Sequence, residues 1–378
     1  NKILNVPHLR FPEFTEEWKE TKLGKIAEIT KGSGISKDRL SEYGSPCILY
    51  GELYTKYKSE IINEVYSRTE LDSSLLVKSK ANDVIIPCSG ETAIDISTAR
   101  CVPFNNILLG GDLNIIRLKN NDGGFFAYQL NGTRKKDIAR VAQGVSVVHL
   151  YGENLKHIRV YHPAIEEQKK ITRLLSLIDK RIATQNKIIE DLKKLKSAIS
   201  ERLFNAIKGD VVVLEDIGDV VKGKQINGEF LSESGKYYVM NGGIEPSGFY
   251  NDYNVEANTI SISEGGNSCG YVQFNACPFW SGGHCYTIQN TTDNVKTEYL
   301  YQFLKSKESE IMKLRIGSGL PNIQKKDLAK FKITIPNISE QKVISAFLSS
   351  FERKADVEMN FVNLLLEEKQ YLLRQMFI

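Results

Sequence analysis

The sequence of 378 residues lacks the features that mark membrane and exported proteins. No run approaches the roughly 18 apolar residues that a membrane-spanning helix needs. Residues 1–7 contain neither the apolar stretch nor the small-residue cleavage site of a secretory signal. We therefore expect a cytoplasmic protein with no membrane partner.

Signatures of metal and redox sites are also missing. The five histidines form no H-E-x-x-H pattern, and the six cysteines form no C-x-x-C pair. We expect reduced, buried thiols and no bound metal. The cysteines are Cys47, Cys88, Cys101, Cys269, Cys277 and Cys285.

The chain has no motif of a nucleotide-dependent or methyl-transferring enzyme. There is no G-x-x-x-x-G-K-[ST], no G-x-G-x-x-G after a strand, and no Asn-Pro-Pro-aromatic tetrapeptide. Ser89 and Ser263 lie on glycine loops but lack the G-x-S-x-G elbow of a serine nucleophile. We therefore predict a non-catalytic chain that binds no cofactor itself.

The tripeptide Glu-Gln-Lys occurs twice, at residues 167–169 and 340–342, in the E-x-K form of some metal-dependent nucleases. Both copies lie in the first turn of a predicted helix, where the helix dipole and the end amides account for a glutamate. We interpret both tripeptides as helix starts.

A strong excess of charge of either sign is absent as well. The net charge is +4 and the isoelectric point is about 8.5. This balance permits a polyanionic partner but falls short of the strongly basic footprint of many nucleic-acid-binding domains. Charge alone therefore does not decide for DNA.

What the sequence does contain is an internal repeat. Residues 163–204 recur as residues 336–377, 173 residues later, and both copies include the pattern Ile-x-Glu-Gln-Lys-x-Ile. An earlier marker, residues 23–32, recurs as residues 214–223, 191 residues later. Because the two offsets differ, the copies differ in length between the markers. The sequence therefore indicates two versions of one unit with divergent middle parts.

A long helix is predicted at the end of each copy, over residues 166–208 and 338–378. Neither stretch contains Gly or Pro, and apolar residues recur at alternating steps of four and three, which is the period of a coiled coil. The predicted seam residues are Ile171, Leu175, Ile178, Ile182, Ile189 and Leu192 in the first helix and Ile344, Leu348, Phe351, Val362, Leu365 and Leu372 in the second.

Polar residues interrupt both seams at matching places, Gln185 with Glu358 and Lys196 with Lys369. A parallel pair of helices would stack the two lysines on each other. We therefore predict antiparallel packing, in which Lys196 lies near Glu358 and Lys369 lies near Gln185. The alternative is that the two helices belong to separate interfaces.

Short β-branched and aromatic runs precede each helix, for example residues 83–87 and 259–263. Glycine and asparagine turns separate these runs, which is typical of strands. We predict an α+β fold class with an internal pseudo-twofold repeat. Two similar mixed globular domains, residues 1–165 and 209–337, are each followed by one long helix.

The loops of these domains indicate recognition rather than catalysis. Arg and Lys suit phosphates and guanine edges, Asn and Gln suit adenine, and Glu can accept from cytosine. Any one such residue is more often a solvated surface residue, but matched sets on matched loops carry more weight. The candidate DNA-binding residues are Lys31, Lys37, Arg39, Tyr50, Glu52, Tyr54, Ser89, Glu91 and Arg100 in the first domain and Lys222, Lys224, Gln225, Asn241, Glu264, Asn267 and His284 in the second.

Four features occur together along the chain. They are the opening Pro-His-Leu-Arg-Phe-Pro-Glu-Phe (7–14) with Trp18, the repeated Leu-x-x-Ile-x-x-Ile/Val-x-Lys-Gly, the Gly-Ser-Gly-Leu-Pro-Asn-Ile at 317–323, and the paired helix starts. In this order they resemble the specificity subunits of type I restriction and modification systems, over nearly the whole chain. The first copy departs at residues 143–149, where Gln-Gly-Val-Ser-Val-Val-His replaces the small residues of 316–322.

The resemblance implies two target recognition domains held apart by an antiparallel coiled coil, each reading one half of a bipartite site in double-stranded DNA. It also implies two methyltransferase subunits docked on the helices, which bring S-adenosylmethionine and the catalytic residues. Restriction subunits that use ATP and Mg would complete the complex. Two other interpretations stay open: the specificity partner of a fused nuclease and methyltransferase, and a coiled-coil scaffold that binds other ligands.

Overall fold

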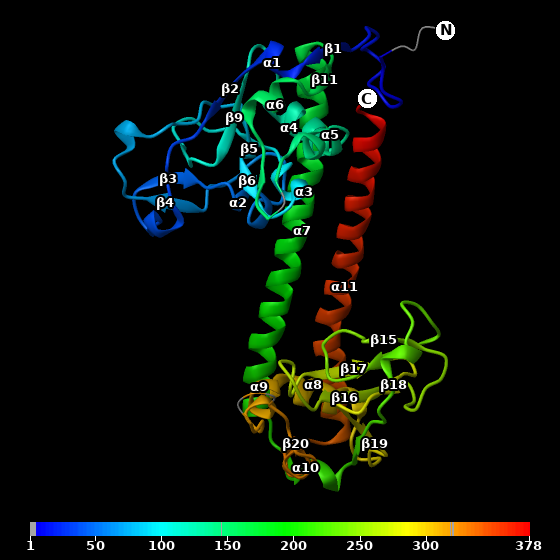
Figure 1. Ribbon diagram of the computed structural model, residues 1–378. Helices are drawn as coiled ribbons and strands as arrows, with labels where there is room; N and C mark the ends of the chain where they lie inside the picture. The colour runs from blue at the N-terminus through cyan, green and yellow to red at the C-terminus, as the bar shows by residue number, and fades with distance from the viewer. Residues whose placement is uncertain (1–4, 145, 318, 320) are drawn as a thin grey trace. The chain divides into compact units, whose positions relative to one another are not determined.

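The computed structural model of the chain describes residues 5–144, 146–317, 319 and 321–378 (Figure 1). The chain divides into two compact units: unit 1 comprises residues 1–186 and 360–378, and unit 2 comprises residues 187–359. Two long helices, α7 (Ile165–Ala206) and α11 (Ile338–Gln375), contribute one part to each unit. No helix in the described part of the chain is long and apolar enough to cross a membrane.

Unit 1 is built on an antiparallel sheet in the order β2-β9-β5-β7. Its central strand β5 (Asp83–Pro87) is buried along its whole length because both of its faces are covered. Val84 and Ile86 pack into one hydrophobic core, and Ile85 packs into another on the opposite face. A smaller sheet has the order β4-β3-β8. The other strands are β1 (Lys19–Lys22), β2 (Ala27–Lys31), β3 (Ser45–Ile48), β4 (Ser67–Thr69), β6 (Ser89–Gly90), β7 (Arg100–Val102), β8 (Leu108–Leu109), β9 (Leu113–Leu118), β10 (Val148–His149) and β11 (Arg159–His162).

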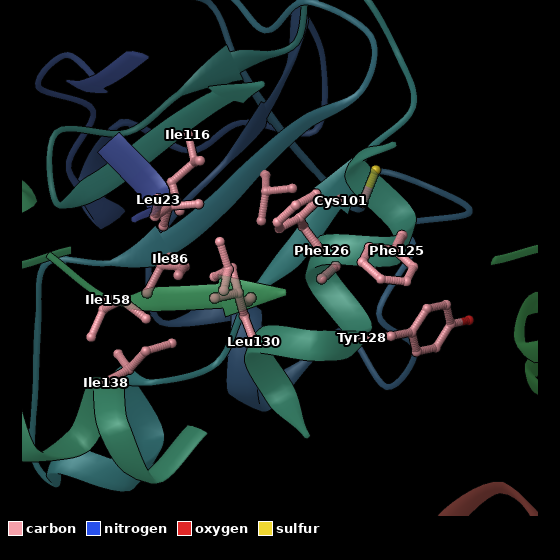
Figure 2. Packing of buried hydrophobic residues seen from close by; sticks show 14 of the residues in the cluster. Leu23, Ile86, Cys101, Ile116, Phe125, Phe126, Tyr128, Leu130, Ile138 and Ile158 are labelled. Carbon is pink, nitrogen blue, oxygen red and sulfur yellow. The ribbon is translucent and has the colours of Figure 1, made fainter. Parts of the chain in front are cut away.

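The larger core of unit 1 gathers side chains from the sheet and from the short helices (Figure 2). Phe125, Phe126, Tyr128 and Leu130 come from α4 (Gly123–Asn131), which is buried over most of its length. The Asp122 carboxylate accepts from the Phe125 N–H at 2.8 Å and so starts this helix. The other short helices are α1 (Leu23–Ile26), η1 (Lys37–Arg39), α2 (Glu52–Thr55), η2 (Ser73–Leu75), α3 (Ala93–Ile96), α5 (Lys135–Val141) and α6 (Gly152–Lys156).

Unit 2 repeats this plan with its own sheets, β13-β19-β16-β17 and β15-β14-β18. Strand for strand, β13, β19, β16 and β17 stand where β2, β9, β5 and β7 stand in unit 1. The predicted duplication and the α+β class are therefore confirmed. The strands are β12 (Asp210–Val213), β13 (Asp219–Lys222), β14 (Tyr237–Met240), β15 (Gly248–Tyr250), β16 (Thr259–Ser263), β17 (Val272–Asn275), β18 (Trp280–Ser281), β19 (Cys285–Gln289) and β20 (Lys332–Ile335), and the short helices are η3 (Leu214–Asp216), η4 (Gly228–Phe230), α8 (Thr297–Ser306), α9 (Glu308–Met312) and α10 (Lys325–Ala329).

Most of the length difference between the copies lies in one connection. In unit 1, residues 49–66 connect β3 to β4 and include α2, and we call them the long link. In unit 2, residues 241–247 connect β14 to β15, and we call them the short link. The long link therefore provides side chains and main-chain groups that have no counterpart in unit 2.

The two long helices pack antiparallel in each unit. In unit 1, Lys369 of α11 pairs with Asp179 of α7 at 2.6 Å, and the Arg181 guanidinium lies 5.4 Å from the Phe361 ring centroid. In unit 2, Lys196 of α7 pairs with Glu352 of α11 at 2.6 Å. The twelve predicted seam residues are all buried or half-buried, as coiled-coil packing requires.

The predicted partners of the seam lysines were wrong. Lys196 pairs with Glu352 rather than Glu358, and Lys369 pairs with Asp179 and with Glu60 of the long link, each at 2.6 Å. The helices are shifted in register relative to the sequence-based alignment, so each lysine meets the opposite helix at a different turn.

The repeated Glu-Gln-Lys tripeptides fasten each globule to its helix through the glutamine. The Gln168 amide donates to the Pro163 carbonyl at 2.9 Å and accepts from the Asp122 N–H at 2.9 Å. Gln341 donates to the Pro336 carbonyl at 2.9 Å and accepts from the Lys296 N–H at 2.8 Å. Both glutamines are fully buried, so we call them the glutamine clamps.

The two glutamates of these tripeptides differ. Glu340 is exposed and bonds to Asn337 beside the helix start, as predicted for a helix-end residue. Glu167 is buried, and its carboxylate accepts two bonds of 2.7 Å from the Arg10 guanidinium and one of 3.4 Å from the Trp18 indole. The opening segment of the chain therefore docks on Glu167, a role that the helix-start interpretation missed.

Candidate nucleic-acid interface

Each globule carries an exposed tip made from two loops. In unit 1, residues 88–91 lie beside residues 143–149 because β6 and β10 pair, with Ser89 opposite His149. In unit 2, residues 264–267 lie beside residues 316–322, with Gly265 opposite Asn322. We call these pairs of loops the first tip and the second tip; Val145, Ser318 and Leu320 lie outside the described residues.

The second loop of each tip closes in the same way although its sequence differs. Gln143 and His149 exchange main-chain hydrogen bonds of 2.9 and 2.7 Å, and Ile316 and Asn322 exchange bonds of 2.8 and 3.0 Å. The departure of the first copy from the family pattern at residues 143–149 therefore changes side chains but keeps the pair of main-chain hydrogen bonds that closes the loop. The side chains of His149 and Asn322 are exposed, and the sequence analysis did not select either one.

A lysine stands beside each tip at the end of the repeated Lys-Gly marker. Lys31 ends β2 and Lys222 ends β13, and both side chains are exposed. A side chain at the following glycine would collide with the main-chain carbonyl of Gly110 in unit 1 or of Gly282 in unit 2. The marker thus needs glycine for a close backbone approach, which brings each lysine to the Gly-Gly turn.

In the second tip, four predicted residues from four segments form one cluster. The Glu264 carboxylate pairs with Lys222 at 2.6 Å and lies 3.6 Å from the His284 Nδ1 atom. The Asn241 side chain accepts from the His284 N–H at 3.2 Å. Glu264 is largely buried, and its Oε2 atom makes no hydrogen bond among the described residues. The cluster therefore offers an acceptor and a cation next to each other.

Tyr286 supports this cluster from below. Its hydroxyl oxygen lies 3.1 Å from the Glu264 carboxylate and 3.1 Å from the Ile323 carbonyl, so its single proton is shared between these two acceptors. Burial, and then the neighbouring Glu264 carboxylate, raise the pKa of Tyr286, so the phenol keeps its proton and remains a donor. The sequence analysis did not select this tyrosine, because it lies inside a strand.

The first tip has the same plan with different side chains. Cys88 corresponds to Glu264, and its N–H donates to the Asp112 carbonyl at 2.7 Å, as the Glu264 N–H donates to the His284 carbonyl at 2.9 Å. Burial raises the pKa of the Cys88 thiol to about 11, with Lys31 opposing and Asp112 adding to the shift. Three positions therefore correspond between the units. They are occupied by Lys31, Cys88 and Asp112 in unit 1 and by Lys222, Glu264 and His284 in unit 2.

A pocket of about 930 Å³ adjoins the first tip and brings together Lys37, Tyr50 and Glu52 of the predicted set. Lys56, half-exposed, also lines it and pairs with Glu52 at 2.6 Å. Glu52 itself is buried, and it accepts from the Leu49 N–H at 3.0 Å and from the Ser67 hydroxyl. Glu52 therefore holds the long link in place instead of facing DNA. Lys56, which the sequence analysis did not select, brings a positive charge to the pocket lining.

Arg100 is not accessible to DNA in this structure. Its guanidinium is buried and donates to the carbonyls of Leu53 at 3.1 Å and Tyr57 at 2.8 Å. Burial lowers the pKa of Arg100, with the Glu60 and Asp179 carboxylates opposing. It was selected from sequence because arginine suits phosphates, but here it holds the long link to the sheet.

The remaining predicted residues do not form one set: Arg39 lies in η1, Tyr54 in α2 and Ser89 in β6, and the others lie on loops. Gln225 lies against Gly283, and the Lys224 N–H donates to the Ser281 carbonyl at 2.9 Å. Burial raises the pKa of Tyr54, followed by the nearby Tyr50 hydroxyl. Within the described residues, no group of three or more His, Cys, Asp or Glu side chains is placed to hold a metal ion. Of all sixteen predicted DNA-binding residues, the exposed ones are Lys31, Lys37, Arg39, Glu91, Lys222, Lys224, Gln225, Asn267 and His284, the half-buried ones are Tyr50, Tyr54, Ser89 and Asn241, and the buried ones are Glu52, Arg100 and Glu264.

Two proteins named as specificity subunits are similar to this chain in sequence. A Mycoplasma pneumoniae protein named as a type I specificity subunit is 34% identical over 161 residues, which are 42% of this chain and 42% of that protein. The chain thus matches less than half the length of that relative. The MjaVIII specificity subunit of Methanocaldococcus jannaschii, named as part of a type I restriction enzyme, is 22% identical over 397 residues, covering 93% of this chain and 89% of that protein.

The fold as a whole also has a solved counterpart. The crystal structure of a type I restriction-modification S subunit from M. genitalium covers 99% of this chain and 99% of that chain, with a TM-score of 0.70 and 19% sequence identity. A family model described as the type I restriction modification DNA specificity domain matches residues 15–194 and 208–365, one match for each copy of the repeat. With both copies matched, the chain belongs to the type I restriction modification DNA specificity family.

Proposed function

We propose that this chain is the DNA-recognition subunit of a type I restriction-modification complex and that each globule reads one half of a bipartite site. The observation that supports this most directly is the pair of tips, which share their main-chain pairings and a lysine but differ in their other side chains. Two readers on the same frame with different chemistry suit two different half-sites. The chain is then non-catalytic, and catalysis belongs to partner subunits.

Within each tip we assign two kinds of role. Lys31 and Lys222, present in both copies, contact phosphates and contribute affinity but no sequence information. The positions that vary, Cys88 and Asp112 against Glu264 and His284, lie where base edges would be read. We assign Glu264 as an acceptor for a cytosine or adenine amino group; its Oε2 atom is buried in the chain without DNA and has no hydrogen-bond partner among the described residues.

The long helices connect the two readers. We propose that residues 166–208 and 338–378 act as the spacer, and that residues 1–165 and 209–337 are the two target recognition domains. The 42 residues of α7 correspond to a helix of roughly 60 Å, more than the roughly 34 Å of one turn of DNA. Base pairs between the half-sites would remain unread.

We further propose that two methyltransferase subunits dock on the helices and supply S-adenosylmethionine, and that restriction subunits supply ATP and Mg sites. Each tip and each helix is then a recognition surface, for DNA or for protein. A fused nuclease and methyltransferase would use the same two-reader chain, but the relatives named above belong to type I systems.

Methylome sequencing tests the proposal. A host without its own DNA methylation would express this chain with its neighbouring methyltransferase, and a control would omit the chain. We expect a bipartite motif methylated on both strands only when the chain is present. An intact, co-purifying complex that methylates no motif would contradict the proposal.

A further inference from the structure

The edge of the main sheet is closed in unit 1. There β7 is the last strand, and residues 60–62 of the long link run parallel to it. The Cys101 N–H donates to the Glu60 carbonyl at 2.8 Å, and the Ile62 N–H donates to the Cys101 carbonyl at 3.0 Å. These residues act as a short additional strand.

At the matching edge of unit 2, β17, the described residues cover the outward main-chain groups of Val272 alone. The Val272 N–H donates to the Glu308 carboxylate at 2.8 Å, and the Val272 carbonyl accepts from Lys305 at 2.9 Å. Asn131 covers the corresponding residue of unit 1, Ala99, with bonds of 2.7 and 2.9 Å. Up to this point the two edges are alike.

The two edges differ one step further along the strand. Phe274 corresponds to Cys101, because it faces Ile260 in the sheet as Cys101 faces Val84. Main-chain groups of an antiparallel strand alternate in direction, so those of Phe274 point to the same open side as those of Val272. Among the residues that the structure describes, no main-chain group pairs with Phe274 on that side, since the short link replaces the long one. Such an unpaired edge is a template for an added strand.

A pocket of about 670 Å³ in unit 2 is lined by Lys305 and Glu308, the two side chains that bond to Val272 at this edge. Its lining includes Gln302 together with four lysines and five acidic residues, among them the ion pairs Lys196–Glu352 and Lys305–Glu308. The Phe274 ring centroid lies 5.5 Å from that of Tyr301, whose hydroxyl donates to Glu352 at 3.2 Å. In unit 1 the side chain of Glu60 reaches the corresponding place, where it pairs with Lys369.

The charges around this pocket are not those that surround Glu60. In unit 1, Glu60 pairs with Lys369, and its negative charge favours the charged forms of Arg100 and Lys135, whose pKa values burial lowers. In unit 2, Lys196 stands for Lys369, but the repeat places Gln273 where Arg100 lies and Glu308 where Lys135 lies. Two of the three cations around Glu60 therefore have no counterpart here. Lys196 and Lys305 are already paired with Glu352 and Glu308, so an added acidic side chain would find less compensation.

Gln302 indicates what the pocket can accept. It is fully buried, and its amide nitrogen donates to Glu352 at 3.0 Å, so its Oε1 atom is the free end. That Oε1 atom makes no hydrogen bond among the described residues. A buried acceptor without a donor is costly, and an N–H donor entering the pocket would remove that cost.

We propose that unit 2 binds an extended segment of a partner protein, which adds a strand to the β17 edge at Phe274 and places an arginine or lysine side chain beside Gln302 and Glu352. Main-chain pairing would supply affinity and the basic side chain would supply selectivity. This surface is distinct from the two tips, and the proposal stands whether or not the tips read DNA.

A synthetic peptide tests the proposal on the full-length chain. The peptide has the sequence of residues 58–64 with Glu60→Arg, blocked ends, a fluorescent label and a photo-reactive group in place of Asn63. We expect saturable binding, crosslinks to residues 272–275 and slower hydrogen exchange of the Phe274 amide. The Glu60 form of the peptide should bind roughly tenfold more weakly, because it lacks the charge-assisted donor.

Two N-methylated peptides are matched controls. Methylation at the Ile62 position removes the N–H that pairs with Cys101 in unit 1 and should abolish binding. Methylation at the Ile61 position, whose N–H points away from the edge, should leave binding unchanged. Absence of binding, crosslinks confined to unit 1, equal effects of the two methylations, or tighter binding of the Glu60 form would each overturn the proposal.

Discussion

A tyrosine, an acid and a lysine join globule to helix in both units, and the two versions differ in burial. In unit 1 the Tyr128 hydroxyl donates to Asp179 at 2.6 Å, and Lys369 pairs with the same carboxylate at 2.6 Å. In unit 2 Tyr301 and Lys196 hold Glu352 at 3.2 and 2.6 Å. The carboxylates are 7% exposed in unit 1 and 33% exposed in unit 2. One frame thus supports a sealed junction, closed by the long link, and an open one.

The largest predicted difference comes from removing the two lysines. Lys369→Met leaves Glu60 and Asp179 buried without their cation and should lower the opening free energy of unit 1 by about 3 kcal/mol. Lys196→Met leaves a carboxylate that water reaches and should cost unit 2 less than about 1 kcal/mol. Hydrogen exchange of the β5 and β16 amides reports each unit separately. Equal losses would show that the two junctions do not differ in burial.

The glutamine clamps, in contrast to the lysines, should contribute equally to the stability of the two units. Gln168→Ala and Gln341→Ala each leave buried main-chain groups without partners, so each should cost its own unit about 2 kcal/mol. The same exchange measurement checks both. Glu340→Ala is a control that keeps the Glu340 N–H bond to Asn337 and loses only an exposed carboxylate in the first helical turn, so it should cost about 0.5 kcal/mol. Unequal losses at the two clamps would refute their equivalence.

The tips should separate shared from individual roles. Lys31→Ala and Lys222→Ala should each weaken DNA binding about tenfold and lower its salt dependence, whatever the sequence of the DNA. Glu264→Cys combined with His284→Asp should instead alter methylation at one half-site and leave the other unchanged. Binding titrations at two salt concentrations and methylome sequencing distinguish these effects. A change at both half-sites would mean that the readers are not independent.

The smallest predicted difference concerns pH. His162 in β11 corresponds to Ile335 in β20. Burial lowers the pKa of His162 below its ordinary value of 6.5; the hydrogen bond to Pro163 opposes this shift and the charge of Lys19 adds to it. The unfolded chain then binds the proton more readily than the folded one, so stability falls as pH drops through about 6.5. Thermal unfolding at pH 7.5 and 5.5 should show a smaller acid-induced loss in His162→Ile than in the unchanged chain. An identical loss in both would exclude His162 as the cause.

Much of the fold followed from sequence because the repeat and the heptads are long-range patterns that survive local error. The strands at residues 83–87 and 259–263 and both long helices appeared at their predicted places, within a few residues at the ends. The helix register did not follow: Lys196 was expected near Glu358 and Lys369 near Gln185, whereas they pair with Glu352 and Asp179. The pairings of Lys196 and Lys369 depend on how the globules pack against the helices, which the helical sequences do not encode.

The site followed less well, and for a physical reason. Arg100 and Glu52 were predicted as DNA contacts from residue type alone. In the structure both are buried and bond to main-chain groups of the long link, whose path is seen only in the folded chain. Asp112 and Tyr286 were missed because a residue in a turn or strand shows no pattern of its own. Aligning the two copies position by position would have exposed Asp112 opposite His284.

The glutamine clamps have a consequence for how such chains change over time. Gln168 and Gln341 grip mainly main-chain atoms of the globule, namely the Asp122 and Lys296 N–H groups and the Pro163 and Pro336 carbonyls. A globule of foreign sequence would meet the same grip provided its backbone took the same path. Under the proposed function, a recombination event that replaces one whole globule would therefore change one half-site while the clamp contacts stay the same.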